Sequence, residues 1–97
     1  MIRFEWDEGK DRQNFEKHKI SFETARLVFD DPYAHSMPER VVEGEERWQT
    51  IGMMRGLTVV VAHTYREEGD EEVIRIISAR KATSAERRIY ESHEAPS

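Results

Sequence analysis

The chain has 97 residues, of which 36% are charged and 37% hydrophobic, and its formal net charge at pH 7 is -5. A chain of this length makes one domain with a small core, so we expect a partner to complete an apolar face. The absence of cysteine excludes disulfides and thiolate metal sites, and no apolar run suits a signal or membrane segment. These properties predict one domain over residues 1–92, a flexible tail over residues 93–97 and a cytoplasmic location.

The N-terminal segment predicts a short strand and then a polar helix. Residues 2–6 alternate between apolar and charged side chains, as a strand does. Asp7 is placed to cap a helix that runs to about Lys19, with Phe15 as its one large apolar anchor. One face of this helix collects polar residues at helical spacing, namely Lys10, Asn14, Lys17 and His18.

A second helix and an irregular stretch follow. Ser21 is placed to cap a helix in which residues 22–29 form a packing stripe, and the sequence Asp30-Asp31-Pro32 ends it. Residues 33–46 are polar and without period. They predict a loop or an edge strand, with a short strand near residues 34–37.

The central part predicts antiparallel strands joined by tight turns. Residues 47–54 and 57–66 flank Arg55-Gly56, which suits a two-residue turn with positive φ at the glycine. A second hairpin closes through residues 67–72. Residues 57–62 are apolar on both faces, which is typical of a central strand.

Strict alternation of side chains assigns the polar ends of these strands to faces of the sheet. It places His63 on the face of residues 59 and 61. It places Ser78 and Arg80 on the face of residues 74 and 76. Each strand is therefore expected to end in polar chemistry.

The last helix has the clearest local signature. Thr83 to Glu86 read Thr-Ser-Ala-Glu, a capping box in which hydroxyl and carboxylate satisfy reciprocal backbone donors. Ala85 and Ile89 predict its apolar seam, Arg87 and Tyr90 share a face, and the chain should fray after Tyr90. The predicted fold class is α+β: an antiparallel sheet of about four strands with two N-terminal helices and one C-terminal helix.

Positive charge is concentrated at the end of the chain. Between Val73 and Tyr90 a single acid, Glu86, stands among five cations, namely Arg75, Arg80, Lys81, Arg87 and Arg88. An acidic protein that keeps one basic corner beside a tyrosine is typical of a site for a polyanion such as RNA.

These motifs together resemble the BrnT family of toxins. The resemblance rests on residues 4–7, the Lys17-His18 and Ser21-Phe22 pairs, residues 29–32, the Ile51-Gly52 pair and the closing motifs from Arg75 to Tyr90. It covers nearly the whole chain and is loosest between residues 33 and 44. The resemblance implies a small RelE-like ribonuclease, the toxin of a type II toxin–antitoxin pair. It also implies a BrnA-type antitoxin with a ribbon-helix-helix region, and contact with operator DNA only through the complex.

RNA cleavage without a metal needs a base, an acid and cations that hold the transition state. Arginine grips two phosphate oxygens at once, so Arg80 and Arg87 are the first candidates for the cations. Tyr90 could stack on a base or exchange a proton. Histidine suits proton transfer near neutral pH, and His18 ranks above His63 because it lies in a family motif.

Each candidate also has an ordinary structural explanation. Arg80 could pair with Glu86, Arg87 with Glu91, and Tyr90 could pack with its hydroxyl at the surface. Candidates for RNA binding outside the catalytic set are Lys17, Lys81, Arg88 and Trp6, although a helix end attracts cations and tryptophan is more often a core anchor.

Cofactors and metal sites are not predicted. The acids of residues 67–72 lack the regular spacing of a calcium loop, and the four histidines make no zinc motif. Two other functions stay open: a non-enzymatic ParE-like inhibitor that blocks a protein target, and a plain protein-binding module. The acidic net charge favours RNA contact at one corner only, or docking of that corner on an acidic antitoxin segment.

Overall fold

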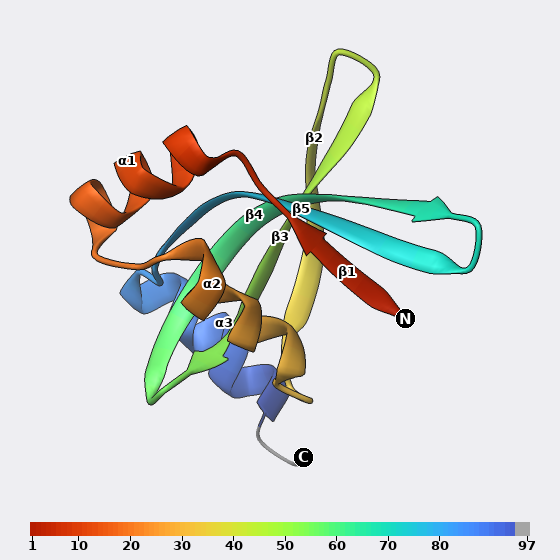
Figure 1. The fold of residues 1–97 in the computed structure, drawn as a ribbon. Helices are drawn as coiled ribbons and strands as arrows, with labels where there is room; N and C mark the ends of the chain where they lie inside the picture. The colour runs from red at the N-terminus through yellow and green to blue at the C-terminus, as the bar shows by residue number, and fades with distance from the viewer. Residues whose placement is uncertain (95–97) are drawn as a thin grey trace.

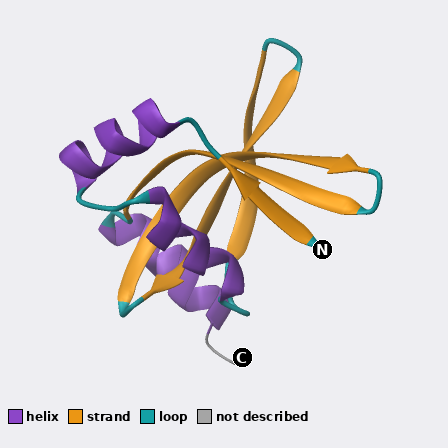
Figure 2. Ribbon diagram, in the orientation of Figure 1, coloured by secondary structure: helices purple, strands orange, loops and turns teal. Residues whose placement is uncertain are grey.

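The computed structural model describes residues 1–94 and has the predicted α+β class (Figures 1 and 2). No helix in this range is both long and apolar enough to cross a membrane. In chain order the elements are β1 (Ile2–Glu5), α1 (Glu8–His18), α2 (Phe22–Ala25), the 3-10 helix η1 (Arg26–Asp30), β2 (His35–Val42), β3 (Glu45–Met54), β4 (Leu57–Glu68), β5 (Glu71–Lys81) and α3 (Ser84–Glu94).

The sheet has five strands in the order β1-β5-β4-β3-β2, so the prediction of about four antiparallel strands was only roughly right. β1 pairs with β5 in parallel, whereas the other neighbours are antiparallel. β2 is an edge strand, one of the two alternatives predicted for residues 33–46, and it is longer than the short strand expected near residues 34–37. Its alternation is hidden by Pro38 and by a register shift between Pro38 and Arg40.

Three tight turns join β2, β3, β4 and β5. Arg55 and Gly56 have φ of 48° and 79°, which confirms the predicted two-residue turn between β3 and β4. Glu43 and Gly44, with φ of 51° and 78°, form a similar turn between β2 and β3 that was not predicted. The β4–β5 turn is shorter than the predicted residues 67–72, because Glu68 still pairs with Glu71, and it contains Gly69 with φ of 61°.

Helices cover both faces of the sheet (Figure 1). The larger core cluster joins α2 and η1 to one face through buried residues that include Phe22, Val28, Val61 and Ile76. On the other face α3 buries Tyr90 against Ile51 and Val60. The first layer needs a glycine in β3, because a Cβ on Gly52 would lie 2.8 Å from Val28 Cγ1.

A β-bulge in β5 corrects the predicted faces of its end. His63 pairs with Ile76 and Ala62 pairs with Ser78, so Ile77 is an extra residue in the ladder. The extra residue shifts the alternation by one position. Ala79, and not Ser78 or Arg80, therefore joins the larger core cluster with Ile76. Arg80 lies opposite Val60, on the face that α3 covers.

The helices also differ from prediction in what they bury. Phe15 is 50% exposed and does not anchor α1, whose buried residue is Asn14. The predicted apolar seam of α3 does not face the sheet, because Ala85 is exposed and Ile89 is 38% exposed. α3 continues to Glu94, past its predicted end at Tyr90 and into the predicted tail, whose residues 95–97 lie outside the described range.

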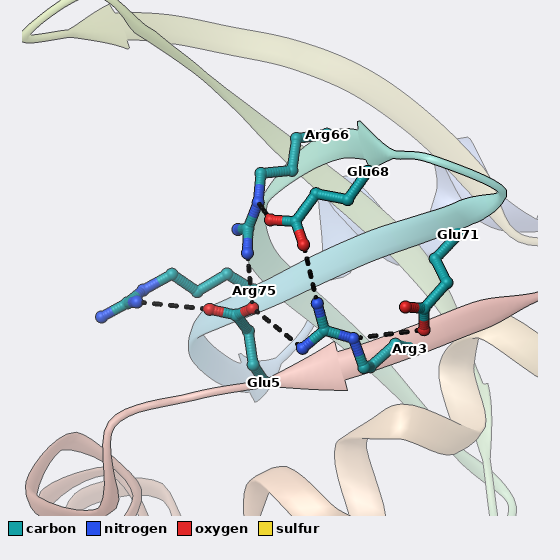
Figure 3. A network of polar contacts seen from close by, with 6 residues as sticks. All are labelled: Arg3, Glu5, Arg66, Glu68, Glu71 and Arg75. Atoms are coloured by element: carbon teal, nitrogen blue, oxygen red, sulfur yellow. Dashed lines mark hydrogen bonds and ion pairs between the residues drawn. The ribbon is translucent and has the colours of Figure 1, made fainter.

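A network of surface ion pairs joins β1 to the β4–β5 hairpin (Figure 3). Arg66 contacts Glu68 at 2.6 Å and Glu5 at 2.7 Å, and Arg3 contacts Glu68 at 3.0 Å and Glu71 at 3.3 Å. Arg75 is held less closely, at 3.6 Å from Glu5. These surface pairs connect β1 to the hairpin in addition to its backbone ladder with β5, and each contributes little to stability.

Candidate active site

The C-terminal end of α1 carries a cluster of basic side chains. Asp7 caps the start of the helix by accepting a hydrogen bond from the backbone N–H of Lys10, as predicted. The helix ends at His18, and Lys19 adopts a left-handed conformation with φ of 62°. Lys17, His18 and Lys19 are therefore presented together where the helix dipole favours cations.

Asn14 fixes this helix against the sheet. β1 covers only the first part of the outer edge of β5, and α1 lies along the remainder. The side-chain amide of Asn14 donates to the carbonyl of Ala79 at 2.9 Å and accepts from its N–H at 3.1 Å, as a neighbouring strand would. It also donates to the carbonyl of Ile20 at 2.9 Å, so the turn after α1 is held as well.

A basic groove results between α1, the end of β5 and the start of α3. It consists of two depressions that share Lys17 and His18, with volumes of about 280 Å³ and 550 Å³. We use the name basic groove for the residues that line them. The first is lined by Lys10, Gln13, Asn14, Lys17, His18, Ile77 and Ser78, and the second by Lys17, His18, Lys19, Arg80, Lys81 and Thr83.

The groove brings together four residues that the sequence suggested separately: His18, Lys17, Arg80 and Lys81. Within the described part of the chain no carboxylate forms an ion pair with any of the groove lysines, Lys10, Lys17, Lys19 and Lys81. The lysines therefore supply an uncompensated positive field in a chain that is acidic overall.

Arg80, in contrast, is paired. Its two terminal nitrogens donate to the two carboxylate oxygens of Glu86 at 2.7 and 2.9 Å. This pair is the ordinary structural explanation for Arg80 that the sequence offered. The predicted capping box also forms, between Thr83 and Glu86. The hydrogen bonds from Arg80 are the main reason that the pKa of Glu86 falls to about 2, with a further contribution from the Thr83 N–H.

Replacing Glu86 with glutamine should remove this ion pair and keep the cap, since the amide oxygen still accepts from Thr83. A carboxylate with a lowered pKa stabilises the fold fully above its ordinary value of 4.5 and loses that contribution as pH falls to about 2. We expect Glu86→Gln to lower the free energy of unfolding at pH 7 by about 1–2 kcal/mol. In urea unfolding the difference from wild type should disappear between pH 4.5 and 2; a difference that persists there would contradict this origin.

Tyr90 lies away from the groove, inside the smaller core cluster, where it is 2% exposed. Its hydroxyl donates to Asp31 Oδ2 at 2.6 Å. Burial alone would raise the pKa of Asp31, but hydrogen bonds from Tyr90 and from the N–H groups of Met53 and Tyr33 lower it. This carboxylate thus joins η1, β3 and α3, a role for Asp31 that the sequence did not predict.

The other candidates lie in three different settings. Arg87 and Arg88 are exposed on α3 and do not line the basic groove. Trp6 is half-buried and packs edge-on against Phe22, with ring centroids 6.2 Å apart, which favours a core role. His63 lies on the opposite face of the sheet from Arg80, with its ring edge-on to Phe29.

His63 is held as a neutral ring. Its Nδ1–H donates to the Thr64 carbonyl at 3.2 Å, and Nε2 contacts the Thr50 hydroxyl at 2.7 Å. Burial is the main cause that lowers the pKa of His63, and the bond to Thr64 offsets it only in part. Among the side chains that the structure describes, those of residues 1–92, no three histidines or acids lie together in a way that could hold a metal ion.

The fold and the groove define a class: a small α+β protein with a basic groove at one sheet edge. A family model described as "Ribonuclease toxin, BrnT, of type II toxin-antitoxin system" matches residues 6–86. The chain therefore belongs to the BrnT family of ribonuclease toxins of type II toxin–antitoxin systems. The search of curated proteins found no match. The matched range contains every residue of the basic groove, whereas Arg87, Arg88 and Tyr90 follow it.

Proposed function

We propose that this toxin cleaves RNA without a metal ion and that the basic groove is its active site. The observation that carries the proposal is the position of His18, which shares one depression with Lys17, Lys19, Arg80 and Lys81. Histidine exchanges protons near neutral pH, and the cations match the charge of a phosphodiester. The function of the family supports the substrate class.

In this mechanism His18 takes the proton of the ribose 2′-hydroxyl or gives one to the leaving 5′-oxygen. The ammonium groups of Lys17, Lys19 and Lys81 lie where they can stabilise the dianionic phosphorane. Arg80 contributes less charge while it is paired with Glu86, so it acts by fixing the groove wall unless the substrate phosphate competes with that carboxylate. Arg87 and Arg88 are better placed for distant contacts with RNA than for the reacting phosphate.

The same pairing favours a second candidate function. An arginine already held by a carboxylate within its own chain is a weak transition-state cation, which would suit a non-enzymatic toxin that blocks a protein target. The two functions differ in whether the groove turns over RNA.

The test is incubation of the purified protein with end-labelled RNA in EDTA, beside a Lys17→Ala/His18→Ala variant of matched circular dichroism. We expect the wild type alone to leave 2′,3′-cyclic phosphate ends. Absence of cleavage both in EDTA and in a separate assay on ribosomes kept intact with Mg²⁺ would reject the nuclease in favour of the inhibitor. Cleavage only on ribosomes would keep the nuclease and change its substrate.

We further propose that a BrnA-type ribbon-helix-helix antitoxin neutralises this toxin and carries it to operator DNA. Two surfaces support a partner of that kind: the outer edge of β2, the last strand of the sheet, where Val41 is 67% exposed, and the outer side of α3 with Ile89. A segment bound along α3 would lie next to Thr83 and Lys81 and could close the groove.

Replacing Tyr90 with phenylalanine separates its two possible roles. The hydroxyl is bonded to Asp31, so its loss should lower the free energy of unfolding by about 1 kcal/mol and the melting temperature by about 4–8 °C. The folded variant should cleave RNA within about twofold of the wild-type rate. Loss of cleavage at unchanged melting temperature would instead assign catalysis to Tyr90.

A further inference from the structure

A row of polar residues crosses the part of the sheet face that α3 leaves open. Arg40 on β2 pairs with Arg47 on β3, Arg47 pairs with Thr64 on β4, and Thr64 pairs with Arg75 on β5. Residues paired in this way point to the same face of a sheet. We call these four residues the arginine row. At its end Glu5 on β1 pairs with Arg75.

The row lies on the same face as Arg80. Thr64 follows His63, which faces the helix layer of η1, and Arg75 lies between two residues of the larger core cluster. After the bulge, Ser78 and Arg80 return to the face of Arg75. The distance along β5 from Arg75 to Arg80 is about 16 Å at the usual rise per residue. Ser78, between them, lines the basic groove.

The row is unfavourable for folding by itself. Arg40 and Arg47 stand directly opposite each other, and like charges at such positions destabilise a sheet. Among the described side chains of residues 1–92 Arg47 has no ion pair, and its Nε is buried without a hydrogen-bond partner. The neighbouring Arg66, in contrast, is held by two carboxylates at 2.7 Å or less.

Thr64 adds a second, independent observation. Its side chain is 2% exposed, and its hydroxyl oxygen is buried without a partner among the described residues. Leaving a buried hydroxyl unpaired is costly, so such a group in a native protein needs an explanation, and a bound ion is one of them. In the strand register Thr64 stands between Arg47 and Arg75. Its hydroxyl and the two guanidinium groups can all donate hydrogen bonds, which suits an anion with several oxygens.

The acids near the row pair with its two ends, Arg40 and Arg75, and not with Arg47 at its centre. Glu5 contacts Arg75 only at 3.6 Å, while its closer contact is with Arg66. Glu39, the residue left out of the β2–β3 register, contacts Arg40 at 3.6 Å and also accepts a hydrogen bond from Gln49. Arg47 and Thr64, at the middle of the row, keep their donors.

We propose that the arginine row binds a second phosphate of the RNA whose reacting phosphate lies in the basic groove. Arg47 and Arg75 grip the phosphate oxygens, and the Thr64 hydroxyl donates to one of them. The RNA then runs from the groove past Ser78 and across the open sheet face. The assignment of the anion to RNA rests on the proposed ribonuclease function.

The test is the affinity of a 2′-O-methyl RNA oligonucleotide, which keeps its charge and lacks the nucleophile. Fluorescence anisotropy is measured against salt for Arg47→Gln and Thr64→Val. Arg26→Gln, in η1 on the opposite side of the sheet, is the control that matches the charge change of Arg47→Gln. Arg47→Gln should weaken binding about tenfold and reduce the slope of log Kd against log salt by about 0.7. Thr64→Val should weaken binding about threefold with the slope unchanged, and its melting temperature should not fall, since the hydroxyl has no partner to lose.

Binding by both variants equal to that of Arg26→Gln would overturn the proposal. Weaker binding of the cognate antitoxin with unchanged binding of RNA would also overturn it, by assigning the row to a protein carboxylate. In the cleavage assay Arg47→Gln should raise KM for a long RNA and leave a dinucleotide unaffected. Because the anisotropy probe needs no turnover, failure of the wild type to cleave would reject the proposed nuclease without deciding the row.

Discussion

Replacing Asn14 with alanine should lower the free energy of unfolding by about 3–5 kcal/mol and the melting temperature by about 15–30 °C. The amide is 7% exposed and makes three hydrogen bonds, to both backbone groups of Ala79 and to the carbonyl of Ile20. Alanine leaves these backbone groups without a partner at the edge of β5. The measurement is thermal and urea unfolding followed by circular dichroism.

Gln13→Ala is the matched control, because Gln13 is the exposed neighbour that lines the same depression. Its effect should stay within about 0.5 kcal/mol. Since Asn14 holds α1 beside β5, its loss should also move Lys17 and His18 away from Arg80. If Asn14→Ala lowered the free energy of unfolding by less than about 1 kcal/mol, the prediction would be wrong, and water or another side chain would replace the amide at Ala79.

His18→Ala should lower the rate of RNA cleavage by about 10²–10⁴-fold with little change in stability. The side chain is half-buried in the groove and makes no hydrogen bond that the fold depends on within the described residues. If the imidazole transfers the proton, the variant should also lose one limb of the pH–rate profile.

Added imidazole distinguishes loss of the His18 ring from loss of a cation. It should restore part of the activity of His18→Ala and none of the activity lost in Lys17→Ala. Arg12→Ala serves as a control on the same helix, since Arg12 lines a different depression. If His18→Ala cleaves at the wild-type rate, the acid and base must be sought elsewhere, first at Glu39, whose charge acts on Arg80.

Local chemistry could be predicted from the sequence where neighbours along the chain determine it. The Asp7 and Ser21 caps, the Arg55-Gly56 turn and the Thr83–Glu86 capping box each depend on residues at most three positions apart. The polar face of α1 also follows from helical spacing alone, so the sequence predicts that Lys17 and His18 lie on one face of the helix.

Long-range contacts could not be predicted in the same way. Asn14 acts on Ala79 and Tyr90 acts on Asp31, pairs separated by 65 and 59 positions. Alternation along β5 gave the wrong face for Ser78 and Arg80 because one extra residue in the ladder leaves no mark in composition. The arginine row was equally hidden, since it exists only in the register between strands.

The bulge at Ile77 also determines where β5 can change in length. In a regular strand the loss of one residue moves every side chain beyond it to the opposite face. Deletion of Ile77 would instead leave Ile76 opposite His63 and Ser78 opposite Ala62, as they already are. β5 could therefore differ by one residue between related toxins while Ala79 stays in the core and Arg80 stays in the groove.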